Sequence, residues 1–320
     1  MISRRTFLRR AFQLGLAGVA LGGYAVAGEP MRLRVQRYRP QPPGWPSDLP
    51  LKIAVLADLH ACRPWMGPDR IRRIVKQTNA MGADLIVLLG DYVASHRFIT
   101  RPVVPDEWAP ILAELTAPLG VHAIMGNHDW NDDRPAQARG YGPIMYHSRL
   151  VDVGINVLEN RAVRLTTTRG DFWLAGLGDQ LAFPPSRRLG RKIWRGADDL
   201  PGTIAQISDD APAILMAHEP DIFPKVPGRI ALTLSGHTHG GQIRVLKHSL
   251  RVPSKFGNRY AYGHIREPDV AGELRDLIVS GGLGCSIFPV RFGVPPEIVL
   301  IDLGTRLQTT RSEDSVFRAG

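Results

Sequence analysis

Short apolar runs alternate with amphipathic segments through the first half of the chain. Three of the runs have the length of buried strands, and they occupy residues 51–56, 85–89 and 121–125. Helices are predicted between them, at about residues 68–81 and 106–116. The order strand, helix, strand, helix, strand predicts right-handed βαβ units and a sheet that contains parallel strands.

The second half of the chain is richer in predicted strands than in predicted helices. A basic, proline-rich segment at residues 181–200 interrupts it and is expected to form a surface loop. The predicted strands of this half occupy residues 155–158, 162–165, 172–176, 213–216, 230–234, 260–265, 274–279 and 297–303.

Polar side chains follow five of the predicted strands at the point where each strand ends. Open α/β sheets bind their ligands at the carboxyl ends of their strands, so we expect these side chains to meet. A single Asp or His after a strand is commonly a turn residue, and this alternative applies to each position separately. The occurrence of Asp, Asn or His at the ends of successive predicted strands favours a common site. The residues are Asp58, His60, Asp91, Asn127, His128, His218, His237 and His239.

The stretch at residues 235–242 places His237 and His239 two positions apart, with glycines on both sides. On an extended strand, side chains two apart share a face, so both rings are expected to point the same way. Two such rings do not easily chelate one ion, but each can serve one of two neighbouring ions. The alternative is a surface turn that carries two histidines by chance.

Together these residues offer carboxylate, amide and imidazole groups but no thiolate. This donor set suits Mn, Fe, Zn or a similar cation better than Ca. The carboxylate of Asp91 can bridge two ions. Two metals about 3.5–4 Å apart form a clamp for in-line displacement at phosphorus and lower the pKa of a bound water. The sequence therefore predicts two divalent metal ions, with Mn, Fe, Zn and Mg all open.

The N-terminus carries the features of an export signal. Residues 3–9 match a twin-arginine motif, and an apolar run follows at residues 11–27. The run ends in Ala-Val-Ala, a small-x-small cleavage pattern, so residues 1–27 are predicted to be a twin-arginine signal peptide. An uncleaved membrane anchor is the alternative. The expected partner is the twin-arginine export machinery, and the expected location is the periplasm or the outer face of the cytoplasmic membrane.

Composition and charge limit the class of partner. The formal net charge is +10, and four arginines in the first ten residues contribute to it. The moderately basic remainder suits phosphate-bearing substrates or an anionic membrane surface. No basic block or aromatic-interleaved basic stripe predicts a specific nucleic-acid partner. Residues 28–50, rich in Pro and Arg, are expected to form an extended lead-in, and residues 305–320 a polar tail.

The chain contains two cysteines, Cys62 and Cys285. In an oxidising compartment they could form a disulfide, because both fall in predicted loops. We expect them to remain free, and mass spectrometry of the non-reduced protein would distinguish the two states.

Five ordered blocks resemble the motifs of the calcineurin-like metallophosphoesterases. They are Asp58-x-His60, Gly90-Asp91, Gly126-Asn127-His128-Asp129, His218 and Gly236-His237-x-His239. Each block alone is a weak signal, but the ordered set is specific and places the domain at residues 51–304. With the leader, the chain resembles bacterial twin-arginine-exported phosphodiesterases, which are related to transmembrane metallophosphoesterases and UDP-2,3-diacylglucosamine pyrophosphatase-like proteins. The resemblance implies an α/β fold, a four-layer sandwich of two mixed β-sheets flanked by helices.

The resemblance also implies a role for each residue of the blocks. It implies one metal ion held by Asp58, His60, Asp91 and His239. It implies a second ion held by Asp91, Asn127, His218 and His237, with Asp91 bridging. His128 would contact the phosphate and protonate the leaving oxygen as a general acid. Asp129 would hold the other ring nitrogen of His128 and so fix its orientation.

Three further residues, Arg63, Tyr92 and Arg291, are candidates for substrate contact. Two of them closely follow metal-ligand blocks, and Arg291 follows a glycine-rich turn from which a guanidinium could reach phosphate. For each, a packed or solvated loop residue is the alternative. Ala94 is a departure from the family pattern, since many relatives carry an acidic or basic residue three positions after the bridging Asp. This departure concerns substrate orientation and not metal binding.

These features predict a phosphodiesterase that uses a metal-bridging hydroxide for in-line attack on phosphorus and acts outside the cytoplasmic membrane. The substrate would be a phosphodiester or a pyrophosphate, and it could be lipid-linked. The main alternative is hydrolysis of a UDP-2,3-diacylglucosamine-type pyrophosphate in lipid A biosynthesis, against which the export leader argues. A binding module that keeps its metals for structure or anion capture is a third hypothesis, and the pair His128 and Asp129 argues against it.

Overall fold

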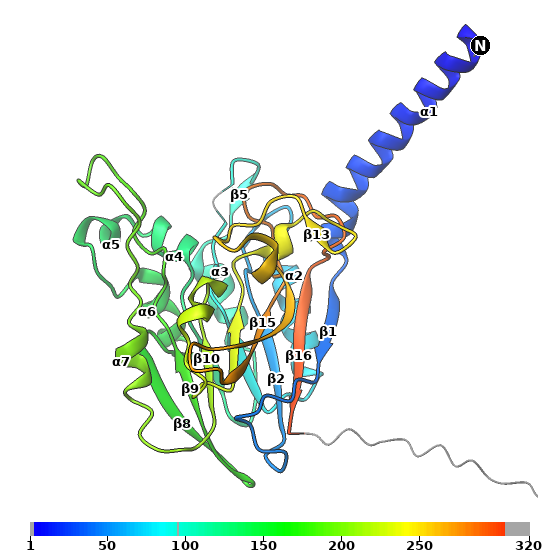
Figure 1. The fold of residues 1–320 in the computed structure, drawn as a ribbon. Helices are drawn as coiled ribbons and strands as arrows, with labels where there is room; N and C mark the ends of the chain where they lie inside the picture. Colours follow the sequence, from blue (N-terminus) through cyan, green and yellow to red (C-terminus); the bar gives the residue numbers. More distant parts are fainter. Residues whose placement is uncertain (1–2, 95, 305–320) are drawn as a thin grey trace, which may run out of the picture.

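The computed structural model describes residues 3–94 and 96–304. The predicted polar tail at residues 305–320 lies outside the described residues, as do the first two residues of the predicted leader. The remainder contains two large sheets that pack face to face, with helices on their outer faces (Figure 1).

The first sheet contains the strands that begin the βαβ pattern. Strands β2, β4, β6 and β7 are parallel, whereas β16 pairs antiparallel with β2 and parallel with β1. The predicted strand at 121–125 ends earlier than expected. The order across the sheet is β1 (Arg34–Tyr38), β16 (Glu297–Leu303), β2 (Leu51–Leu56), β4 (Leu85–Leu88), β6 (Val121–Ala123) and β7 (Asn156–Val157).

The second sheet has the same mixed character. Strands β9, β10, β11 and β15 are parallel, and β8 and β14 close its two edges as antiparallel partners. The order across the sheet is β14 (Gly263–Pro268), β15 (Leu274–Val279), β11 (Leu232–Ser235), β10 (Ala213–Met216), β9 (Gly170–Gly176) and β8 (Arg161–Thr167).

Alternate residues of each central strand face opposite sides of its sheet. The apolar residues of the first sheet therefore contribute to two separate clusters, one on each face. In β2, Ile53 and Val55 face the second sheet, whereas Ala54 and Leu56 face the helices that cover the first sheet. The outer face of the second sheet, around Leu215, forms a third apolar cluster with the 3-10 turn η3 (Pro220–Lys225). The predicted α/β sandwich of two mixed sheets flanked by helices is therefore confirmed.

Short elements complete the layers around the sheets. Helix α3 packs against α2 and against α6 over the first sheet, and α7 lies against β8 and β9. Two small ribbons, β3 with β5 and β12 with β13, stand at the edge where the parallel strands end. The helices are α2 (Pro68–Asn79), α3 (Pro105–Leu112), α4 (Asn127–Asp132), α5 (Arg134–Arg139), α6 (Met145–Asp152) and α7 (Leu200–Ile204). The ribbons are β3 (Cys62–Arg63) with β5 (Arg101–Pro102), and β12 (Arg244–Val245) with β13 (His248–Ser249).

The extended lead-in predicted at residues 28–50 contains a strand that the sequence did not indicate. Residues 34–38 form β1 and add a parallel edge strand to β16. Arg34 Nη2 lies 2.9 Å from the fully buried Glu297 carboxylate and ties the two strands together. The strand was missed because it is short and largely polar, so that it lacks the apolar pattern of a buried strand.

The N-terminal segment forms a helix that stands apart from the domain (Figure 1). Helix α1 (Arg4–Gly23) continues through a π-helical turn (Tyr24–Gly28) and the 3-10 turn Glu29–Met31, and none of α1 is buried. Residues Arg4–Met31 are long and apolar enough to cross a membrane, a test that signal sequences also pass. Cleavage after Ala27 stays a prediction.

Candidate metal centre

The polar residues that follow the strands converge at one edge of the sandwich. Four side chains in particular are almost completely buried there, with exposures of 0% for Asp58, 1% for Asp91, 1% for His218 and 2% for His239. They come from different strands of both sheets, so the site spans the interface between the two layers.

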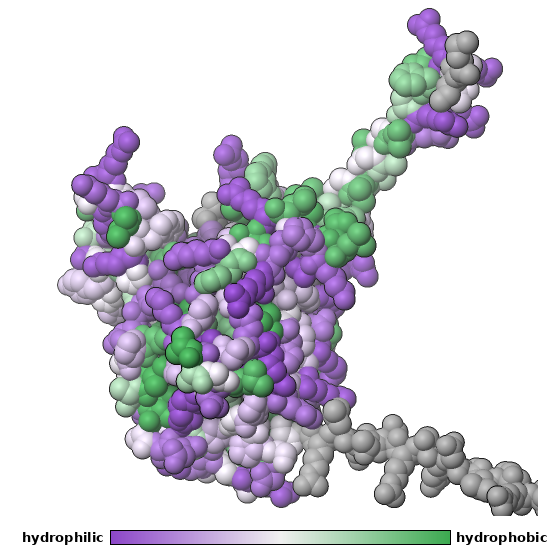
Figure 2. Space-filling model, viewed as in Figure 1, coloured by the Kyte–Doolittle hydropathy of each residue, from purple (hydrophilic) through white to green (hydrophobic). Residues whose placement is uncertain are grey.

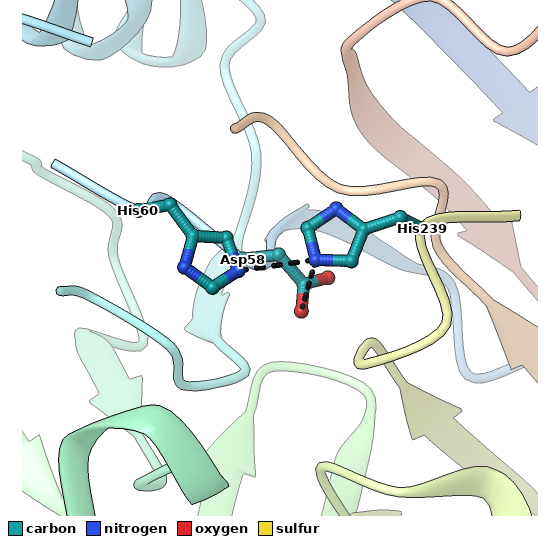
Figure 3. A group of neighbouring side chains, drawn as sticks. All are labelled: Asp58, His60 and His239. Carbon is teal, nitrogen blue, oxygen red and sulfur yellow. Dashed lines mark hydrogen bonds and ion pairs between the residues drawn. The ribbon is translucent and has the colours of Figure 1, made fainter. Parts of the chain in front are cut away.

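Asp58, His60 and His239 form one cluster (Figure 3). The Nε2 atoms of the two imidazoles are 3.0 Å apart, and His239 Nε2 lies 3.7 Å from Asp58 Oδ1. The Nδ1 atom of His60 lies 2.9 Å from the carbonyl oxygen of Val93, which fixes the ring and directs Nε2 inward. Burial lowers the pKa of His60 to about 3, so the ring is neutral and offers a lone pair.

Asp91, His218 and His237 form a second cluster beside the first. His218 Nε2 lies 3.2 Å from Asp91 Oδ2, and its Nδ1 is fixed 2.6 Å from the carbonyl oxygen of Leu89. On the other side of this cluster, His237 Nδ1 lies 3.0 Å from Asn127 Oδ1. His237 therefore lies in the second cluster and His239 in the first, as predicted for two histidines that serve different ions.

The Asp91 carboxylate lies between the two clusters. Its Oδ2 atom is 3.2 Å from His218 Nε2 and 3.6 Å from His60 Nε2, so one oxygen faces an imidazole of each cluster. Burial by itself raises the pKa of this carboxyl, but the positive field of His218 and His128 outweighs it and holds the pKa well below the usual range. Asp91 is therefore a buried carboxylate that attracts positive charge from two sides.

Most of the predicted ligands adopt left-handed backbone conformations. The φ angles are 54° at Asp58, 45° at His60, 57° at Asp91, 66° at His237 and 51° at His239. This corrects the expectation that an extended strand sends both histidines of the last block to one face, because β11 ends at Ser235, before either of them. The left-handed turns direct the two rings into different clusters instead.

Two glycines of the motifs make room for the site. A Cβ atom on Gly90 would lie 2.4 Å from the amide nitrogen of Gly126, and Gly90 has a φ of 89°. A Cβ atom on Gly126 would lie 2.4 Å from Asp91 Oδ1. Both positions exclude any larger residue, and this explains why the blocks pair Gly with Asp and Gly with Asn.

His128 is half-buried at the edge of the clusters. Its ring meets the ring of His60 edge to face at 4.8 Å, and its backbone N–H donates to Asp91 Oδ1 at 2.8 Å. Its Nε2 lies 3.3 Å from the hydroxyl of Ser286. The imidazole therefore stands beside the clusters with part of its surface open to solvent.

Asp129 is completely buried and contacts the backbone of two neighbouring turns. Its two carboxylate oxygens accept hydrogen bonds from the backbone N–H groups of Asp91 (2.9 Å), Tyr92 (2.8 Å) and Gly126 (2.9 Å). The carboxylate thus holds together the turns that carry Asp91 and Asn127. Orientation of the His128 ring by Asp129 stays a prediction beside this role.

Arg291, a candidate for substrate contact, lies in the interior of the domain. Its side chain is completely buried, and its guanidinium donates to the carbonyl oxygens of Gly284 and Val294. Nη2 also lies 3.2 Å from His239 Nδ1. Arg291 therefore supports the loop behind His239, and its contact with substrate stays a prediction.

Tyr92 and Arg63 were also predicted to line the substrate mouth. Tyr92 is 2% exposed, donates its hydroxyl to the carbonyl oxygen of Ile124 and stacks on Trp108 in the core. Arg63 is directed toward α3, where its Nη2 lies 2.9 Å from Glu107 Oε1. Tyr92 is thus packed in the core, Arg63 belongs to an ion pair, and contact of either residue with substrate stays a prediction.

Two carboxyl groups beside the second cluster were missed. Asp179 and Glu219 are 0% and 2% exposed, and each has an oxygen within 4.8 Å of a ring nitrogen of His218. Burial, together with the charge of Glu219, raises the pKa of Asp179 well above its usual range. The signal was present, because Asp179 follows the buried strand β9 just as Asp58 follows β2.

The two cysteines are both free and buried, as expected. Burial raises the pKa of the Cys62 thiol to about 11, so it stays protonated at neutral pH.

The residues present fit a pair of divalent cations. Among the described residues, Asp58 Oδ2 is a buried carboxylate oxygen without a hydrogen-bond partner. Buried polar atoms are normally paired, so an oxygen in this position is suited to contact a cation. The mixture of carboxylate, amide and imidazole donors suits Mn, Fe or Zn.

Comparison with known proteins agrees with this geometry. The sequence model of the family described as Calcineurin-like phosphoesterase matches residues 51–241. Phosphodiesterase YaeI of Escherichia coli (strain K12) is 31% identical over 312 residues, which cover 95% of this chain and 100% of the relative. Uncharacterized metallophosphoesterase YkuE of Bacillus subtilis (strain 168) is 29% identical over 318 residues, 94% of this chain and 98% of the relative. A bovine (Bos taurus) transmembrane protein with metallophosphoesterase domain is 29% identical over 267 residues, 81% of this chain and 54% of that protein.

Proposed function

The chain belongs to the calcineurin-like phosphoesterase family and is a hydrolase of phosphoester bonds, and from this premise we propose that it is a binuclear-metal phosphodiesterase acting outside the cytoplasmic membrane. The observation that carries the proposal is the position of Asp91, whose Oδ2 lies 3.2 Å from His218 Nε2 and 3.6 Å from His60 Nε2. A single carboxylate oxygen that faces both clusters is what a pair of adjacent cations requires of a shared ligand.

The two clusters divide the ligands between two metal sites. The first site would use Asp58, His60, Asp91 and His239, and the second Asp91, Asn127, His218 and His237. When bound, the two cations would supply Lewis acidity at the phosphate and a water of lowered pKa as nucleophile. The protein's contribution is to hold the imidazoles of His60 and His218 in place through the carbonyl oxygens of Val93 and Leu89, which contact the ring nitrogens turned away from the site.

His128 supplies the proton that the leaving group needs. It lies at the half-buried edge of the site, beside the ring of His60, and its backbone is tied to Asp91. Hydrolysis breaks a bond from phosphorus to an ester oxygen, and that oxygen leaves as an alcohol once it accepts a proton. An imidazole at this edge is placed to donate it to an outgoing group.

Specificity for diesters and the extracytoplasmic location rest on separate support. The similarity to Phosphodiesterase YaeI extends over 95% of this chain and supports diester hydrolysis. The twin-arginine motif at residues 3–9 and the apolar helix that follows support export or anchoring.

Metal dependence is the direct test of this function. Purified full-length protein that has been stripped of metal with a chelator should not hydrolyse a chromogenic bis-aryl phosphate, and addition of Mn²⁺ should restore hydrolysis. The reason is that the shared carboxylate and the imidazoles act only through bound cations. Release of nitrophenolate measures the rate. Full activity of the stripped protein, with less than one metal per chain by elemental analysis, would overturn the proposal.

The separation of His237 from His239 gives a second test. His237→Ala should weaken the site shared with His218, and His239→Ala the site shared with His60, because the two rings lie in different clusters. Each variant should retain about one tightly bound metal, and titration with Mn²⁺ should recover activity at a higher metal concentration than in the parent. His248→Ala is the matched control, since His248 lies in the exposed β12–β13 hairpin. Complete loss of both ions in both variants would contradict the division.

A further inference from the structure

The loop at residues 285–288 connects the catalytic edge to an exposed apolar surface. The Ser286 hydroxyl lies 3.3 Å from His128 Nε2, and the backbone N–H of Ser286 donates to Gln242 Oε1 at 2.7 Å. The next two residues turn outward, with Ile287 60% and Phe288 55% exposed. Two large apolar side chains therefore stand in water directly beside the residue that faces the substrate, where no folding requirement explains them.

Neighbouring loops extend this surface on both sides. The ring of Phe98 lies 5.8 Å from that of Phe288 and is itself 43% exposed. On the other side, Gln242 Nε2 donates to the carbonyl oxygen of Phe288 and so joins the loop to the β12–β13 hairpin, whose tip residue Leu246 is 97% exposed. We call the following set of exposed residues the apolar rim: Phe98, Val245, Leu246, Leu250, Ile287 and Phe288.

The base of α1 is fixed beside the apolar rim. The carbonyl oxygen of Ala25 accepts a hydrogen bond from the Arg291 backbone N–H at 2.9 Å, and that of Val26 from Trp65 Nε1 at 3.1 Å. From Trp65 the aromatic contacts continue through His96 to Phe98, at centroid distances of 5.7 and 6.3 Å. Figure 2 shows apolar surface at the base of α1 and on the adjoining loops near β5 and β13.

These contacts make the last turns of the predicted leader part of the domain surface. Helix α1 and the turns that continue it form a stretch of 28 residues, Arg4–Met31, that is long and apolar enough to cross a membrane. Its outer end carries Arg4, Arg5, Arg9 and Arg10 and no acidic residue. Positive charge at that end favours the cytoplasmic side, which places the domain on the opposite face of the membrane.

We propose that α1 is retained as an anchor, that the apolar rim docks on the outer surface of the bilayer, and that the substrate is the phosphodiester headgroup of a membrane phospholipid. This rests on the proposed phosphodiesterase function and names its substrate class. The occupant of the apolar rim is a lipid surface because the rim is continuous with a helix of membrane length. Three exposed basic residues are next to rim residues in the sequence and attract anionic headgroups. They are Arg97, Lys247 and Arg251.

The chemistry of such a substrate balances with water alone. The oxygen of water forms the new bond to phosphorus, and one of the two ester P–O bonds of the headgroup breaks. The leaving oxygen takes a proton from His128, the attacking water releases a proton that reprotonates the imidazole through solvent, and the products are an alcohol and a phosphate monoester. With the rim at the bilayer surface, the headgroup reaches His128 without removal of the acyl chains from the membrane.

The test compares two substrates on the full-length protein. The double variant Ile287→Ser/Phe288→Ser, reconstituted in vesicles of phosphatidylcholine with phosphatidylglycerol, should release headgroup products at least about tenfold more slowly than the parent, because two apolar side chains no longer enter the interface. Its hydrolysis of the soluble bis-aryl phosphate should stay within about twofold of the parent, since neither side chain contacts the clusters. The matched control is Val151→Ser/Val270→Ser, at two exposed valines outside the rim (49% and 99% exposed).

Several outcomes would overturn the inference while leaving the proposed function intact. One is hydrolysis of the soluble diester without any turnover of vesicle lipid. Another is an equal effect of the rim and control variants on lipid turnover. Dimerisation of the detergent-solubilised parent that the rim variant abolishes would assign the rim to a second copy of the chain. A mature protein that begins at Gly28 would remove the anchor. Failure of the soluble assay in the parent would instead refute the phosphodiesterase function itself.

Discussion

Replacement of Asp91 by Asn should abolish hydrolysis of the chromogenic diester, with a loss on the order of 10³-fold or more. The substitution preserves the shape of the side chain, and the remaining carbonyl oxygen can still accept the hydrogen bond that the His128 backbone N–H donates to Oδ1. It removes the negative charge that lies between His60 and His218 and replaces the shared ligand atom with an N–H₂ group that cannot bind a cation. Metal stoichiometry should fall together with the rate.

The control for this experiment is Asp302→Asn. Asp302 lies on β16 in the same sheet and forms a partly exposed ion pair with Arg39 at 3.5 Å, away from the clusters. Both variants should show the circular dichroism spectrum of the parent, and only Asp91→Asn should lose activity. Activity of Asp91→Asn within tenfold of the parent, with both metals retained, would contradict the assignment of the shared carboxylate.

The second large effect is expected from His128→Gln. General acid catalysis contributes about 10²–10⁴-fold to rate, so hydrolysis of an alkyl phosphodiester should slow by that amount. A nitrophenolate leaving group departs without protonation, and its release should be much less affected. Both metals should remain bound, because the family resemblance implies that His128 is not a metal ligand. Its ring lies at the edge of the clusters, beside the ring of His60.

The dependence on the leaving group separates a proton donor from a metal ligand. Loss of a metal ligand would slow all esters by a similar factor and would change metal stoichiometry. A uniform loss for alkyl and nitrophenyl esters in His128→Gln would therefore exclude the role of general acid. His147→Gln serves as the control, since His147 lies on α6 outside the site.

The position of the site could be predicted from the sequence because it depends on a simple rule. Apolar runs of strand length are visible along the chain, and residues at the carboxyl ends of parallel strands meet whatever the loops do. The rule brought together residues from Asp58 to His239 across both sheets. Applied to the strand predicted at residues 172–176, which is β9 in the structure, the rule also indicates Asp179, to which it was not applied.

Side-chain direction could not be predicted in the same way. Arg291, Tyr92 and Arg63 follow turns near the site, but their partners are carbonyl oxygens, a core ring and Glu107, which no local pattern reveals. Asp129 was assigned to the ring beside it in sequence, whereas its oxygens reach backbone N–H groups across two turns. Such contacts depend on the relative placement of two loops, and a single sequence does not specify that placement.

The left-handed backbone at Asp58, His60, Asp91, His237 and His239 restricts which amino acids can occupy these positions. Non-glycine residues in this conformation typically cost about 1–3 kcal/mol each, and Asp, Asn and His tolerate it better than most. These types are also oxygen and nitrogen donors for cations. Glu, although it offers the same carboxylate as Asp, lacks this tolerance, and Gly accepts the backbone but offers no ligand. The backbone conformation and the need for a metal ligand therefore restrict these positions to the same few amino acids. Few substitutions in these loops would preserve activity.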